Sequence, residues 1–111
     1  VQRWARRVPL HARGMVLADD TLFIAGPPDL VDEEKAVRSV GRQETMEKLR
    51  RQDAASKGQE GGLLWAIRPG DGEELATYEL DSPPIFDGLA AADGRLYISS
   101  MDGTVQCMAP K

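Results

Sequence analysis

Hydrophobic and polar residues alternate along most of this chain, which is the period-2 pattern of strands with one buried face. The expected strands are residues 1–8, 13–18, 21–25, 62–68, 75–80, 85–92, 95–99 and 104–108, with turns rich in Gly, Pro and Asp between them. Asp93 and Gly94 are typical of a type I′ hairpin turn, in which both central residues need positive φ. Asp20 occupies the glycine's place in the turn at Asp19 and Asp20, so we expect that turn to be looser or of a different type.

Part of the pattern occurs twice. Residues 14–24 (GMVLADDTLFI) match residues 88–98 (GLAAADGRLYI) at an offset of 74 with five of eleven positions identical, and the same offset pairs Trp4 with Tyr78 and Pro9 with Pro83. Residues 62–69 (GLLWAIRP) resemble residues 103–110 (GTVQCMAP) at an offset of 41. A unit of 41 residues fits the length of about 40–45 residues of one four-stranded propeller blade. The sequence therefore predicts two copies of one unit, each of which buries its apolar faces only against neighbours.

The two offsets differ by 33 residues, which the first copy carries as an insertion at about residues 29–60. From residue 32 to residue 57 the chain is charged, lacks aromatic residues and favours helix formers. We expect helices there, interrupted at Gly41 and ended at Gly58. Met46 and Leu49 form a thin apolar face, so the second helix is expected to lie lightly on the body of the protein.

These elements predict an all-β fold: residues 1–111 form one unit of two four-stranded propeller blades, with seven to eight strands and a helical insertion. The first strand, with Trp4, completes a blade by pairing with the last strand around Val105, either in its own chain or in another copy. Two blades cannot close a ring of about four to eight. Because a lone pair of blades exposes apolar faces and strand edges, we expect the chain to belong to a larger propeller or to assemble with copies of itself. Its start at Val1 rather than at Met suggests a processed protein or an excised piece.

Charge and cysteine content narrow the function classes. The net charge of −4 disfavours nucleic acid as a partner, and no segment has the length and hydropathy of a membrane span. Four arginines near the start (Arg3, Arg6, Arg7 and Arg13) are interpreted as solvated strand and loop residues, with an anionic polysaccharide or protein partner as the alternative. Cys107, the sole cysteine, excludes an internal disulfide and is expected to be a buried thiol in a strand.

Three segments resemble the bacterial PQQ-like, or quinoprotein-type, β-propeller repeat: GGLLWAIRPGDGEELATYEL, DSPPIFDGLAAADGRLYIS and GRLYISSMDGTVQCM. The second is similar to the C-terminal blades of exported bacterial propellers. The resemblance implies an exported or periplasmic protein whose propeller serves as a scaffold or as the cofactor cradle of a quinoprotein dehydrogenase.

The cradle of that family holds calcium through acidic and amide oxygens, stacks the quinone on a tryptophan and carries a vicinal cysteine pair. This chain has one cysteine and no asparagine, and we interpret Trp65 as a packing residue. The resemblance therefore implies no catalytic residue, cofactor or metal here. The expected function is a non-catalytic scaffold or binding module for proteins or glycans. The alternative is a fragment of a PQQ-dependent dehydrogenase whose active site lies on other blades.

Two groups of side chains are candidate sites. Asp71, Asp93 and Asp102 offer oxygens to calcium, but each precedes a glycine in a predicted turn, and we interpret them as turn residues. The starts of the innermost strands carry three candidate channel-mouth contacts, namely His11, Arg13 and Asp87. Asp87 aligns with Arg13 across the repeat, and a structural ion pair or a solvated pair is the alternative interpretation. The sole histidine has no nucleophile at motif spacing, so no enzyme is predicted.

Overall fold

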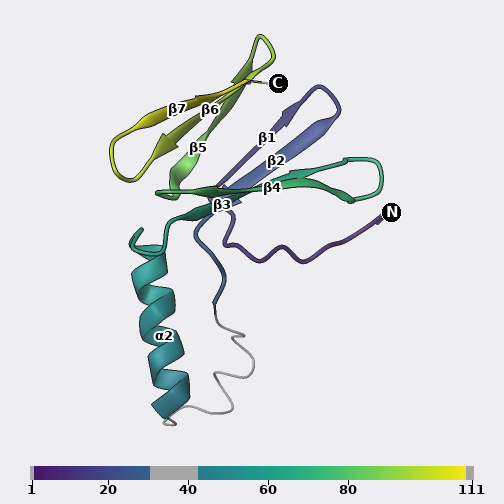
Figure 1. Ribbon diagram of the computed structural model, residues 1–111. Coiled ribbons are helices and arrows are strands. Elements are labelled where there is room, and N and C mark those ends of the chain that lie inside the picture. The colour runs from purple at the N-terminus through teal and green to yellow at the C-terminus, as the bar shows by residue number, and fades with distance from the viewer. Residues whose placement is uncertain (1, 31–42, 110–111) are drawn as a thin grey trace.

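Two antiparallel sheets and one helix make up the computed structural model, which describes residues 2–30 and 43–109 (Figure 1). The elements are β1 (Gly14–Ala18), β2 (Thr21–Gly26), α2 (Gln43–Ser56), β3 (Gly62–Ile67), β4 (Glu74–Leu80), β5 (Pro84–Ala92), β6 (Arg95–Ser100) and β7 (Val105–Met108). The first sheet has the order β1-β2-β3-β4 and the second sheet the order β5-β6-β7. The predicted mostly-β chain with a helical insertion is confirmed at this level, whereas the described residues form no closed ring of blades.

Both sheets are built on the same register. The pairs Met15↔Ile24 to Ala18↔Thr21 between β1 and β2 recur 74 residues later, as Leu89↔Ile98 to Ala92↔Arg95 between β5 and β6. The pairs of β2 with β3 recur between β6 and β7, because β6 corresponds to β2 at an offset of 74 and β7 corresponds to β3 at an offset of 41. The pair Leu22↔Ile67 thus corresponds to Leu96↔Met108. The internal repeat predicted from the sequence is therefore confirmed strand by strand.

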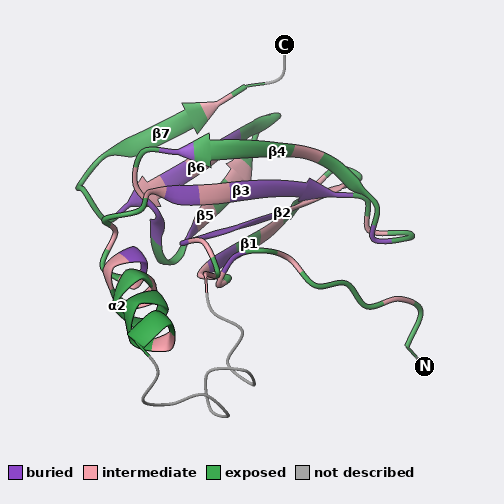
Figure 2. Ribbon diagram, turned by 60° about the horizontal axis from the view of Figure 1, so that its bottom comes forward, coloured by how far each residue is buried: buried purple, intermediate pink, exposed green. Residues whose placement is uncertain are grey.

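The main core lies between the two sheets, where β1 runs beside β5. Its buried residues are Ala25, Leu64, Leu80, Leu96 and Ile98, and Val16, Phe23, Leu89 and Met108 pack against them. We call the faces that meet there the inner faces. Figure 2 shows β3 buried along most of its length, whereas β7 is largely exposed.

The N-terminal segment does not form the predicted strand: residues 2–8, the described part of it, are irregular. They run over the outer face of the first sheet, where Trp4 and Val8 pack against a cluster that includes Ile24, Trp65 and Ile67. The indole N–H of Trp4 donates to the carbonyl of Pro69 at 2.8 Å. Burial of these apolar side chains on the first sheet takes the place of pairing with the last strand.

Helix α2 confirms the second predicted helix, and the predicted stop is correct because Gly58, two residues after its end, has φ of 93°. Ala55 is its buried residue, while Met46 and Leu49 remain exposed. The helix therefore projects from the body, as Figure 1 shows, and adds little to the core. The helix expected before Gly41 lies outside the described residues. No helix in the described ranges is long and apolar enough to cross a bilayer.

The two hairpin turns of the repeat differ as predicted. Asp93 and Gly94 have φ of 52° and 74°, the pair of positive values that a type I′ turn needs. In the first copy Asp19 has φ of 51°, whereas Asp20 does not have positive φ, so that turn is of a different type. Glycine at the second position thus decides which turn forms.

Candidate functional site

The outer face of the second sheet carries apolar residues that no described segment covers. Its residues alternate with the inner-face residues along β5, β6 and β7: Ala90, Tyr97, Ser99, Val105 and Cys107. We call this set the open face. Val105 is 71% exposed, and Cys107 is exposed as well. The prediction of a buried Cys107 is therefore wrong, because the alternation places the thiol on a face over which no described segment lies.

The internal repeat relates the open face of the second sheet to the inner face of the first sheet. At the offsets of 74 and 41, Tyr97 corresponds to Phe23 and Val105 to Leu64. Leu64 and its neighbour Ala25 are fully buried, because the second sheet covers the inner face of the first. The open face is thus the counterpart of a surface that packs against the next sheet.

A bulge in β5 lies at the junction of the two sheets. The register with β6 shifts between Pro84 and Leu89, so the intervening residues loop outward. Phe86 is 76% exposed, with the Arg13 guanidinium 5.3 Å from its ring centroid, and Asp87 has φ of 57°. The bulge presents an aromatic and an acidic side chain beside the junction of the two sheets.

The structure brings together two of the three predicted channel-mouth residues. The backbone N–H of Asp87 donates to the carbonyl of Arg13 at 2.8 Å, but no ion pair between their side chains occurs in the described chain. His11 instead faces Asp29, with 3.1 Å between Nε2 and Oδ1. Arg13 and Asp87 are thus joined through the main chain, and His11 is engaged elsewhere; a role of the three at a channel mouth stays a prediction.

The side chain of Arg13 links both sheets and the helix. Its guanidinium donates to the Met101 Sδ at 2.8 Å, to the Pro84 carbonyl at 3.5 Å and to the Ser56 carbonyl at the end of α2. A cation at a helix C-terminus meets the unpaired carbonyls and the negative end of the helix dipole. These contacts make Arg13 a structural junction.

A cleft of about 660 Å³ opens between the sheets near the β1–β2 and β5–β6 turns. Its apolar walls include Phe23, Tyr78, Leu96 and Met108, and its polar rim includes Asp19, Asp93 and Arg95. No motif in the sequence indicates this cleft, because it arises from the angle between two sheets. Most of its lining is apolar, so the cleft offers apolar contact to a partner.

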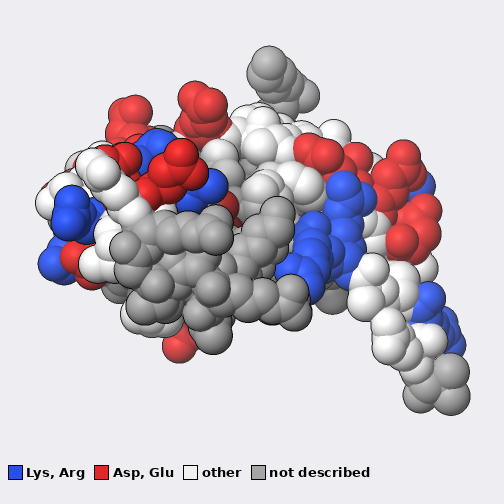
Figure 3. Space-filling model, turned by 90° about the horizontal axis from the view of Figure 1, so that it is seen from below, with Lys and Arg blue, Asp and Glu red and all other residues white. Residues whose placement is uncertain are grey.

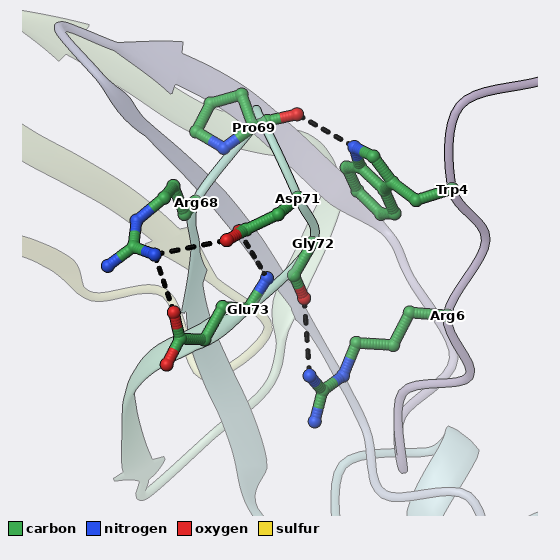
Figure 4. Close-up of polar contacts among 7 residues, drawn as sticks. All are labelled: Trp4, Arg6, Arg68, Pro69, Asp71, Gly72 and Glu73. Carbon is green, nitrogen blue, oxygen red and sulfur yellow. Dashed lines mark hydrogen bonds and ion pairs between the residues drawn. The ribbon is translucent and has the colours of Figure 1, made fainter.

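The predicted turn aspartates are held by their own turns. The N–H of Glu73 donates to the Asp71 Oδ1 at 3.0 Å and lowers the pKa of that carboxyl, and Arg68 lies 3.1 Å from the Oδ2 (Figure 4). The hydroxyl of Thr104 donates to the Asp102 Oδ1 at 2.7 Å and lowers its pKa likewise. No cluster of three or more metal-ligating side chains occurs among the residues that the structure describes.

One of the N-terminal arginines, Arg6, makes contacts with the first sheet. Arg6 donates to the Gly72 carbonyl at 3.2 Å, lies 3.8 Å from the Glu74 carboxylate and stacks 5.1 Å from the Trp65 ring centroid. Trp65 is buried in the outer cluster of the first sheet, so its predicted packing role is confirmed. Figure 3 shows basic and acidic side chains interspersed over the face seen from below, without a large area of one sign.

The open face, the bulge and the cleft are three surfaces of the described residues that a partner can contact. Comparison with protein-family models, with curated proteins and with solved structures finds no match to this chain.

Proposed function

We propose that the chain is a non-catalytic scaffold of the β-propeller type, two blades whose open face takes a further blade. That blade comes from the rest of a larger propeller or from another copy of the chain. The observation that carries the proposal is the equivalence of the exposed Val105 with the buried Leu64. In a stack of identical units, a face that is buried in one unit is buried in the next by the same kind of contact.

The sheet order supports the blade interpretation. A blade is a four-stranded antiparallel sheet whose strands follow one another in the chain, and the first sheet has this order. The innermost strands of successive blades lie next to each other, and here β1 lies beside β5. With the unit length of 41 residues, these features favour a propeller over a closed two-sheet sandwich.

Energetics favour a covered open face. Fully burying a side chain such as Val, Leu or Phe contributes roughly 1.5–3 kcal/mol relative to leaving it exposed. Val105, which is 71% exposed, and Phe86, which is 76% exposed, can therefore each contribute up to about this amount when a partner covers them. The same surface in water is an aggregation hazard.

A non-catalytic role is supported by where the charged groups lie. Among the residues that the structure describes, the four groups with shifted pKa values are the exposed turn and helix-end residues Lys57, Arg68, Asp71 and Asp102, and each is explained by a local partner. None of them lines the cleft. Perturbed groups that gather in a cleft would have favoured an active site.

Light scattering over a range of concentrations tests the proposal. The chain should exceed the mass of one 12.1 kDa copy, and Val105→Asp should return it to that mass by placing a charge on the open face. Met46→Asp, the same chemistry on an exposed position of α2, is the control and should assemble like the parent chain. A parent chain that stays a monodisperse monomer with a sharp thermal transition would contradict the proposal.

Adding pyrroloquinoline quinone with Ca²⁺ separates the scaffold from the dehydrogenase alternative. A ligand that binds the folded state raises the melting temperature by mass action. The scaffold proposal expects no shift. A clear rise would favour the enzyme fragment instead.

A further inference from the structure

The second sheet ends one strand earlier than the first. In the first sheet β4 pairs with the outer edge of β3, from Gly62↔Leu80 to Ile67↔Glu74. In the second sheet β7 pairs with β6 on one side, and no described residue pairs with its other edge. A row of unpaired N–H and C=O groups is a template for another strand.

The N-terminal segment has a main chain whose hydrogen-bonding groups can pair with such an edge. Residues 2–8 make no backbone–backbone hydrogen bond to the rest of the described chain, and the side chains of Trp4 and Arg6 supply the hydrogen bonds that hold them. The cover that they form is imperfect, since the buried Trp65 Nε1 beneath them has no hydrogen-bond partner. The main chain of this segment is therefore available for pairing.

The repeat gives the register of that pairing. At the offset of 74, residues 2–6 correspond to residues 76–80 of β4, and at 41 β7 corresponds to β3. The pairs Leu64↔Tyr78 and Ala66↔Ala76 then become Val105 opposite Trp4 and Cys107 opposite Gln2. An aromatic side chain directly across from a β-branched one is a favourable cross-strand pair, and this one would cover the exposed Val105.

We propose that residues 2–6 of one copy add to the free edge of β7 in a second copy as its fourth, antiparallel strand. This inference rests on the proposed scaffold function and names its partner. It uses a second copy because the N-terminal segment lies on the outer face of the first sheet, while β7 belongs to the sheet that packs on the opposite, inner face (Figure 1).

The two surfaces that meet in this arrangement differ from each other. Each copy donates a segment at one end and accepts one at the other, so the contact is heterologous and continues into a ring or an open chain of copies. As the donor strand docks, the outer face of its own first sheet comes to lie against the open face of the acceptor. This places Tyr97 and Val105 in the position that Phe23 and Leu64 hold within one chain.

A disulfide at the native Cys107 tests the register. Gln2→Cys should join Cys107 of a second copy under a mild oxidant such as diamide, giving dimers and higher multiples on a non-reducing gel. Arg3→Cys is the matched control, because its side chain points to the other face of the same strand. Gln2→Cys should cross-link several-fold more than Arg3→Cys, and adding Cys107→Ser to the Gln2→Cys variant should abolish the product.

Equal cross-linking of the two variants would overturn the inference, since it would show contact without a strand register. A disulfide within a single copy, seen as a faster-moving monomer, would also overturn it. The parent chain separates the two proposals: if it assembles by light scattering while Gln2→Cys fails to cross-link, strand addition is wrong and the scaffold function stands. A monomeric parent chain overturns both.

Discussion

The two sheets of this chain share one register but differ in what covers them. The first sheet has the second sheet on its inner face and the N-terminal segment on its outer face, whereas the described residues cover the second sheet on its inner face alone. Equivalent positions therefore differ in burial: Leu64 is fully buried, and Val105 is mostly exposed. The alternation of a strand decides which residues share a face, while neighbours decide whether that face is buried.

The largest expected difference between the sheets lies at this equivalent pair. Leu64→Ala should lower the free energy of unfolding by about 2–5 kcal/mol, as buried leucine truncations do. Val105→Ala at the exposed counterpart should change it by less than about 0.5 kcal/mol in dilute solution. Urea denaturation of both variants measures the two values. A large loss for Val105→Ala in a monomeric sample would show that the open face is already covered.

The turns after β3 and β6 sharpen the comparison. A methyl group at Gly72, with φ of 76°, would lie 2.6 Å from the Trp4 ring, whereas at Gly103, with φ of 87°, it would meet no atom within 4 Å. Each alanine costs about 1–2 kcal/mol for the left-handed backbone. Gly72→Ala should cost more than Gly103→Ala and should also release Trp4. Urea melts, with tryptophan fluorescence to follow the indole, give both readouts, and equal losses would place Trp4 elsewhere.

The junction between the sheets should respond to the loss of Arg13. Arg13→Ala removes hydrogen bonds to Pro84, Met101 and the end of α2, each worth about 1 kcal/mol net. His11→Ala removes the contact with Asp29, an exposed pair worth about 0–1 kcal/mol. The unfolding free energy should therefore fall further for Arg13→Ala. The opposite order would mean that Arg13 is a solvated residue.

The smallest effects are expected from acid. Asp71 in the first sheet and Asp102 in the second have pKa values lowered by hydrogen bonds from Glu73 and Thr104, respectively. Their stabilising contribution is therefore present above the unfolded value near 3.9 and is lost as the pH falls through the lower folded value. The urea midpoint should fall below about pH 4, and Asp102→Asn should flatten part of that fall. An unchanged profile for that variant would show that the turn is not held by its carboxylate.

Much of the fold could be predicted because short-range sequence patterns determine it. The alternation of polar and apolar residues predicts the seven observed strands. The repeat predicts that β1 pairs with β2 in the same register as β5 with β6, so that Leu22 and Leu96 hold equivalent places. The Asp-Gly dipeptide predicts the turn at Asp93. These features depend on neighbours in sequence or on one copy resembling the other.

The errors arose where distant parts of the chain decide the outcome. The path of residues 2–8 depends on the space above Gly72, and Cys107 is exposed because no described segment covers its face. His11 meets Asp29 rather than the other predicted contacts for the same reason. The cleft could not be predicted, because it depends on how the two sheets are inclined.

The labelling rate of Cys107 tests the central claim most directly. This sole cysteine lies on the open face, so its labelling rate shows whether a second copy covers that face. The measurement is the reaction with a maleimide reagent in excess at rising protein concentration, with Met46→Cys in a Cys107→Ser background as the control on an exposed helix. We predict that labelling of Cys107 slows as the concentration rises, while labelling of the control stays constant. A Cys107 that reacts equally fast at every concentration would contradict the account.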